Sequence, residues 1–268
     1  MDLSQKVALV TGSSRGIGRA ISTKMAEYKA TVILTDMRIS DLGEVATDIK
    51  QKFPGTIIES MELDVTNQSS VDQVITEAFD NFGQIDILVN NAGIVGASGW
   101  ENRAVSGDID WDQIYSVNVK GVARMSHAVA KLMKIRTYGK IVNIASMAGR
   151  QGKPWNTPYH ASKAGVISIT QAYAFELAPF NVNVNAICPG LLWTPLWDRI
   201  ATRNIKIDNK LKDLTPRELF EQIVSDMTPL GREQTPEDIG NLAVFLASDL
   251  AINITGQSIN VNGGSRMD

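Results

Sequence analysis

The chain has 268 residues, a mass of 29.2 kDa and a formal net charge of −3. Hydrophobic residues make up 44% and charged residues 21%, which excludes disordered and fibrous classes because a full core can form. The mild acidity argues against nucleic acid as a partner, and no run approaches the roughly 20 apolar residues of a membrane-spanning helix. Cys188 is the only cysteine, and no signal segment precedes the first strand-like run, so we expect a cytoplasmic protein without disulfides or a metal site.

Short β-branched runs alternate with amphipathic stretches along the chain. We expect strands at residues 7–10, 31–35, 57–63, 85–89, 140–144, 181–187 and 258–261. Several runs lack polar alternation, which is typical of parallel strands covered on both faces. The longest helical pattern lies at 111–133. The sequence therefore predicts a single-domain α/β fold over residues 1–268, a Rossmann-type doubly wound parallel sheet of about seven strands flanked by helices. A charged, helix-favouring insert at about 195–228 is predicted to form a helical substrate lid.

A glycine-rich turn follows the first predicted strand and opens a helix. Without side chains, such a turn lets backbone N–H groups and the positive helix terminus approach a pyrophosphate. Its GxxxGxG spacing differs from the common dinucleotide fingerprint, so tight packing of helix on strand is the alternative reading. The candidate cofactor contacts in this turn are Gly12, Ser14, Arg15, Gly16, Ile17 and Gly18.

Asp36 closes the second predicted strand, 18 residues beyond Gly18. A carboxylate near this offset accepts hydrogen bonds from both adenosine ribose hydroxyls and repels a 2′-phosphate. Arg15 favours NADP instead, because a guanidinium can pair with that phosphate. We give Asp36 the greater weight and expect NAD rather than NADP.

Tyr159 and Lys163 are four residues apart, so on a helix their side chains share one face. The pKa of a free phenol is about 10, and a nearby ammonium lowers it by favouring the phenolate. Ser146, at the end of the fifth predicted strand, would hold a substrate oxygen against Tyr159. Taken singly, the three read as a core tyrosine, a solvated lysine and a capping serine; together they predict proton transfer at an alcohol or ketone.

Further motifs accompany these residues in order along the chain: Asn90-Asn91-Ala92-Gly93, Asn118, Tyr159-His160-Ala161-Ser162-Lys163, and Pro189-Gly190 with Thr194 beyond. With the glycine turn, they resemble the short-chain dehydrogenase/reductase family over essentially the whole chain. The resemblance implies an NAD(P)-dependent oxidoreductase acting on CH–OH groups, with Tyr159 as general acid/base beside hydride transfer. It also implies that Asn118 stabilises a kink in the central helix, whose freed carbonyl holds a water in a proton path through Lys163.

The same resemblance assigns the remaining cofactor contacts. Asp64 and Val65 would flank the adenine, and Lys163 would hold the nicotinamide ribose by its hydroxyls. The other implied contacts are Asn91, Ala92, Gly93, Tyr159, Pro189, Gly190, Leu192 and Thr194. Members of the family are commonly tetramers, so we expect a homotetramer.

The substrate must be inferred from the loops and the lid. Tryptophans in loop or lid segments can stack on a sugar face or cover an apolar ring. The predicted substrate contacts are Ser146, Tyr159, Trp100, Trp155, Trp193 and Trp197. The loop after Pro189 is similar to that of polyol and vicinal-diol dehydrogenases, so a sugar alcohol or vicinal diol is expected. The alternative is a 3-oxoacyl reductase or 3-hydroxyacyl dehydrogenase acting on a thioester or aromatic hydroxyacyl substrate.

Two other functional classes, a hydrolase and a nucleotide sensor without catalytic activity, are each contradicted by a feature of the sequence. A hydrolase built on Ser146 would need a nucleophile elbow and a histidine partner, but the sequence has no GxSxG and only two histidines, His127 and His160. A nucleotide sensor that lacks chemistry should have lost one of the catalytic residues, and all are present.

Overall fold

The computed structural model describes residues 1–268, except for the side chain of Trp155. The strands are β1 (Val7–Thr11), β2 (Thr31–Asp36), β3 (Ile58–Glu62), β4 (Ile87–Asn90), β5 (Gly139–Ile144), β6 (Val182–Pro189) and β7 (Ser258–Val261). The α-helices are α1 (Gly16–Glu27), α2 (Ile39–Lys52), α3 (Gln68–Phe82), α4 (Asp108–Tyr115), α5 (Val122–Arg136), α6 (Thr157–Leu177), α7 (Pro195–Ile207), α8 (Pro216–Met227) and α9 (Pro236–Ala247).

All seven strands form one parallel sheet in the order β3-β2-β1-β4-β5-β6-β7. The chain winds outward from β1 to β3 and then, in the opposite direction, from β4 to β7. The strand order reverses between β1 and β4, and ligands of such sheets bind in the crevice at the carboxyl ends of the strands there. The predicted doubly wound parallel sheet is confirmed.

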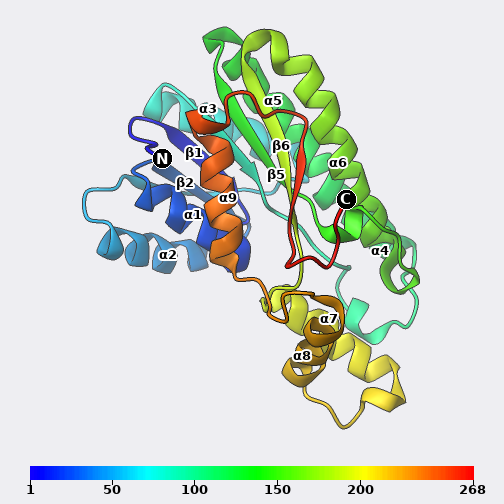
Figure 1. The fold of residues 1–268 in the computed structure, drawn as a ribbon. Helices are drawn as coiled ribbons and strands as arrows, with labels where there is room; N and C mark the ends of the chain where they lie inside the picture. The colour runs from blue at the N-terminus through cyan, green and yellow to red at the C-terminus, as the bar shows by residue number, and fades with distance from the viewer.

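Helices cover both faces of the sheet (Figure 1). Helices α1, α2 and α9 pack on one face, and α3, α5 and α6 pack on the other. Along β1, Ala8 and Val10 face the first layer, whereas Val7 and Leu9 face the second. Because both faces are buried, the strand needs no polar alternation, which explains the unbroken apolar runs in the sequence.

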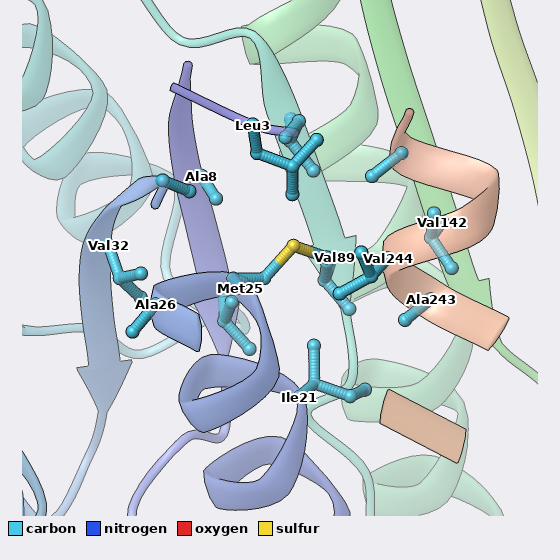
Figure 2. Packing of buried hydrophobic residues seen from close by; sticks show 14 of the residues in the cluster. Leu3, Ala8, Ile21, Met25, Ala26, Val32, Val89, Val142, Ala243 and Val244 are labelled. Carbon is cyan, nitrogen blue, oxygen red and sulfur yellow. The ribbon is translucent and has the colours of Figure 1, made fainter. Parts of the chain in front are cut away.

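The first helical layer packs tightly against the sheet. Figure 2 shows Ile21 and Met25 of α1 close to Ala243 and Val244 of α9, around Val89 of β4. All five side chains are fully buried. Close packing of this kind resists small displacements, so the start of α1 keeps a fixed position relative to β1.

The predicted elements agree with the observed ones in number and order, and each strand boundary lies within two residues of its prediction. The helical pattern at 111–133 belongs to a longer run that consists of α4, a π-helical segment at Ser116–Gly121, and α5. No helix of the described chain has both the length and the apolar character that crossing a membrane requires.

The predicted lid segment forms α7 and α8, joined through a short 3-10 turn at Asn209–Leu211. Thr194 caps α7 and is followed by Pro195 at the first helical position, which favours a helix start. Thr215 and Glu218 form a capping box at the start of α8. Both helices lie beyond the end of β6, away from the sheet (Figure 1).

Candidate active site

A cavity of about 1030 Å³ opens where β1, β4, β5 and β6 end, with the lid helices on its far side. It has two parts that share one wall. One part is lined by the glycine turn and by residues that follow β2, β3 and β4; the other is lined by residues after β5 and by the lid. The topology therefore brings the predicted nucleotide and chemistry residues to one place.

The glycine turn leaves the start of α1 open to this cavity. Gly12 and Gly16 have positive φ angles of 66° and 54°, a conformation that glycine adopts without strain. Both line the cavity, whereas Gly18 does not. A Cβ atom on Gly18 would lie 2.1 Å from the carbonyl oxygen of Gly12, so Gly18 permits close packing of the turn. The turn provides the bare backbone that a pyrophosphate requires.

Asp36 lies beside this turn, and its carboxylate is held by backbone and hydroxyl donors. Ser14 donates to Oδ2 through its hydroxyl (2.7 Å) and its backbone N–H (3.3 Å), and the N–H of Arg38 donates to Oδ1. Ser14, predicted as a cofactor contact, is buried and does not line the cavity, and it holds the carboxylate of Asp36 instead. Arg15 and Arg38 line the cavity next to Asp36.

The remaining predicted cofactor residues also line the cavity or hold its wall. Asn91 donates from Nδ2 to the carbonyl oxygens of Thr11 and Gly12, both at 2.9 Å, and so ties the end of β4 to the glycine turn. The predicted contacts found in the lining are Arg15, Ile17, Asp36, Asp64, Val65, Asn91, Ala92, Gly93, Tyr159, Lys163, Pro189, Gly190, Leu192 and Thr194. The glycine turn, Asp36 beside it and the residues after β4 and β6 line one cavity. This combination fits a nicotinamide dinucleotide.

Ser146, Tyr159 and Lys163 meet at the wall that both parts of the cavity share. Ser146 follows β5, whereas Tyr159 and Lys163 lie one turn apart on α6. The phenol of Tyr159 lies beside Ser146, close enough for the Ser146 side chain to lower the pKa of Tyr159 in part. The amine of Lys163 lies 5.8 Å from the centre of the Tyr159 ring and donates to the carbonyl oxygen of Ile144 at 2.7 Å. The structure therefore brings the three predicted catalytic side chains together in the lining of one cavity.

Asn118 lies behind this wall, in the middle of the π-helical segment. Its amide exchanges two hydrogen bonds of 2.9 Å with the backbone of Ile94, and it donates to the hydroxyl of Ser162 at 3.0 Å. π-helical turns are rare and are found frequently at functional sites. The expected irregularity of the central helix is present, and Asn118 links it to the loop after β4 and to α6.

The arrangement agrees with the comparison with known proteins. Residues 12–266 match the family model described as enoyl-(acyl carrier protein) reductase. The chain is 38% identical to the 3-oxoacyl-acyl-carrier-protein reductase FabG of Aquifex aeolicus over 98% of each chain. This chain is a short-chain dehydrogenase/reductase. Among solved structures, an NAD⁺-bound xylitol dehydrogenase (TM-score 0.90, 31% identity, 98% and 100% of the two chains) and an actinorhodin polyketide ketoreductase with NADPH (TM-score 0.89, 31% identity, 99% of each chain) share its fold.

Burial shifts the pKa values of Tyr159 and Lys163 in opposite directions. Burial raises the pKa of Tyr159 to about 12, although its hydrogen bond with Ser146 lowers it in part. Burial lowers the pKa of Lys163 to about 8, so the amine keeps its proton at neutral pH. Below pH 8 the positive charge of Lys163 is therefore present near the Tyr159 ring, where it favours the phenolate.

His160, which sequence analysis did not assign to the site, ties the loop after Ser146 to α6. Its Nδ1 lies 2.9 Å from the carbonyl oxygen of Ala148 and 2.8 Å from that of Gln151. Two carbonyl acceptors require a proton on Nδ1, so His160 donates to both. The histidine follows Tyr159 directly and so orders the loop that carries Ser146. In the sequence, a role for His160 at the site is indicated by its position in the motif that runs from Tyr159 to Lys163.

Of the tryptophans predicted to contact the substrate, the structure places one in the cavity lining and two outside it. Trp197 lines the cavity. Trp100 does not: it is fully buried beneath the guanidinium of Arg203, 4.5 Å from the ring centre, and we withdraw it as a substrate contact. Trp193 is also absent from the lining; its ring packs against Phe220, 5.2 Å away between ring centres, and against the guanidinium of Arg217, and we withdraw it as well. The side chain of Trp155 lies outside the described residues.

Proposed function

We propose that this enzyme interconverts a secondary alcohol and a ketone with NAD as its coenzyme. The observation that carries the proposal is that Ser146, Tyr159 and Lys163 line one cavity together with the glycine turn and Asp36. General acid/base groups next to a nucleotide site are what hydride transfer at a CH–OH group requires.

The residues of the chain divide the proton chemistry between them. When bound, the nicotinamide accepts hydride from the carbinol carbon in oxidation and returns it in reduction. Ser146 orients the substrate oxygen by a hydrogen bond, and Tyr159 as phenolate accepts the hydroxyl proton during oxidation. In reduction the phenol gives the proton back to the carbonyl oxygen. Lys163 keeps a positive charge near the ring, and Asn118 keeps Ile94 and Ser162 in place behind it.

The coenzyme preference is proposed from Asp36. Its carboxylate is held by Ser14 and Arg38 at the rim of the nucleotide part of the cavity, where it is placed to accept from ribose hydroxyls. A 2′-phosphate there would be repelled by the carboxylate, although Arg15 and Arg38 would attract it. Asp36 thus decides between the two coenzymes.

Replacing Asp36 with serine should reverse this preference. The substitution removes the repulsion and leaves Arg15 and Arg38, so the ratio of kcat/KM for NADP to that for NAD should rise about a hundredfold, given that like charges in contact cost several kcal/mol. Steady-state kinetics with each coenzyme measures the ratio. Asp80→Ser, at an exposed acid on α3 outside the cavity lining, serves as the control and should leave the ratio unchanged. A wild-type enzyme that already prefers NADP would overturn the assignment.

Two substrate classes are candidates, a sugar alcohol or vicinal diol and a 3-oxoacyl or 3-hydroxyacyl thioester. The xylitol dehydrogenase fold match supports the first, and the similarity to the 3-oxoacyl reductase supports the second. The test is to record the absorbance of the reduced coenzyme with NAD and, in parallel, with NADP. The substrates are sugar alcohols, vicinal diols, simple secondary alcohols and 3-hydroxyacyl thioesters. No turnover of any of these with either coenzyme would contradict the proposed function.

We further propose that the enzyme acts as a homotetramer that pairs copies of α5 and α6. Each of these helices carries a large apolar side chain that no other part of the chain covers. Ile135 on α5 is 81% exposed and Phe175 on α6 is 88% exposed. Side chains of this kind are enriched where subunits meet.

A further inference from the structure

The substrate end of the cavity has an apolar surface on each side of the reacting pair. On one side, Tyr159 packs against a cluster that contains Val95, Leu196 and Ile200. On the other side, Met147, which follows Ser146, packs with Ile223 and Met227 of α8 and with Leu191. All of these apolar side chains line the cavity. Trp197 belongs to both clusters and so lies between the two surfaces.

The polar side chains at this end are largely engaged with other parts of the protein. Arg199 donates to Glu101 and to the carbonyl oxygens of Gly96 and Ala97. Arg266 donates to Asp268 and Gln151. Of the other polar lining residues, Lys153 and Asn204 are half-exposed and Asp208 is exposed, so these side chains remain in contact with solvent. The side chains that pack around Tyr159 and Met147 are mainly hydrocarbon.

We propose that the reacting carbon of the substrate is flanked by hydrocarbon, an alkyl chain or a ring, rather than by further hydroxyl groups. The inference rests on the proposed function and narrows its substrate. Burying a hydroxyl without a partner costs about 1–3 kcal/mol, whereas each buried methylene contributes about 0.8 kcal/mol. A polyol would place hydroxyl groups against both apolar surfaces. An alkyl chain or a ring would instead pack its methylene groups against these surfaces.

A homologous series tests the inference on the purified full-length chain. With saturating NAD, kcat/KM is measured for 2-butanol, 2-hexanol, 2-octanol and cyclohexanol, and for xylitol and sorbitol. We expect kcat/KM to rise about fourfold for each added methylene until the cavity is filled, with both polyols below 2-butanol. Polyols better than all the alkanols would overturn the inference while leaving the proposed function intact. No turnover of any alcohol with NAD or NADP would instead contradict the proposed function itself.

Two variants test whether the apolar surface formed by α8 contacts the substrate. Ile223→Asn places an amide in the lid wall and should lower kcat/KM for 2-octanol about tenfold, with a smaller effect on 2-butanol. The matched control is Leu230→Asn, because Leu230 is 59% exposed just beyond α8 and does not line the cavity. Calorimetric titration with NAD shows whether each variant retains the folded nucleotide site. Equal losses for the two alcohols in a variant that still binds NAD would overturn the role of this wall.

Discussion

Replacing Tyr159 with phenylalanine should lower kcat about a thousandfold and leave the affinity for NAD nearly unchanged. The substitution removes only the hydroxyl that exchanges a proton with the substrate. The aromatic ring stays and keeps its contacts with the apolar cluster around Val95 and Ile200. Initial rates at saturating substrate, with NAD binding measured by calorimetry, separate the loss of chemistry from a loss of binding.

A second tyrosine on the same helix provides the control. Tyr173 donates its hydroxyl to the carbonyl oxygen of Ala123 at 3.1 Å and lies outside the cavity lining. Tyr173→Phe should therefore keep kcat within a small factor of the wild-type value. Substantial turnover in Tyr159→Phe would mean that another group exchanges the proton.

Replacing Lys163 with methionine should lower the rate of alcohol oxidation at pH 7 about a hundredfold and move its pH dependence upward. In the wild type the pKa of Lys163 is about 8, so its charge is present below that pH and favours the Tyr159 phenolate. Burial already raises the pKa of Tyr159 to about 12 in the wild type, and removing the Lys163 charge takes away an interaction that favours the phenolate. Oxidation by the variant should thus keep rising up to pH 10, whereas the wild-type rate should level off earlier.

The measurement is log kcat against pH between 6 and 10 for both proteins. NAD affinity is measured alongside, because Lys163 is also proposed to hold the nicotinamide ribose. Lys131→Met on α5 removes an exposed lysine and should leave the profile unchanged. Parallel profiles for wild type and Lys163→Met would show that the lysine acts on binding alone.

Much of the fold could be predicted from sequence because its signals are local. The runs that became β1 and β5 are buried on both faces, and this requirement alone produces unbroken apolar stretches. Asp36 could be assigned because a strand end at a set distance from a glycine turn occupies a defined place in a βαβ unit. Tyr159 and Lys163 could be paired because four residues make about one helical turn.

Other features depend on residues that are far apart in the sequence. Trp100 and Trp197 both lie in predicted loop or lid segments, yet Arg203, about one hundred residues beyond Trp100, covers one ring while the other faces the cavity. The hydrogen bonds of Asn118 to Ile94 and Ser162 span 24 and 44 residues. No local pattern indicates which side chain will meet such a partner.

Local patterns in the sequence were enough to predict the parallel sheet, the glycine turn, the acid at the end of β2 and the group of Ser146, Tyr159 and Lys163. These follow from burial, spacing and backbone freedom, which act over a few residues. The three-dimensional packing was needed to show that Ser14 holds Asp36, that His160 ties the loop after Ser146 to α6, and that apolar clusters contain Tyr159 and Met147. Each of these depends on which distant segments pack together, because hydrogen bonds and apolar contacts form only between groups that the fold brings within a few ångströms.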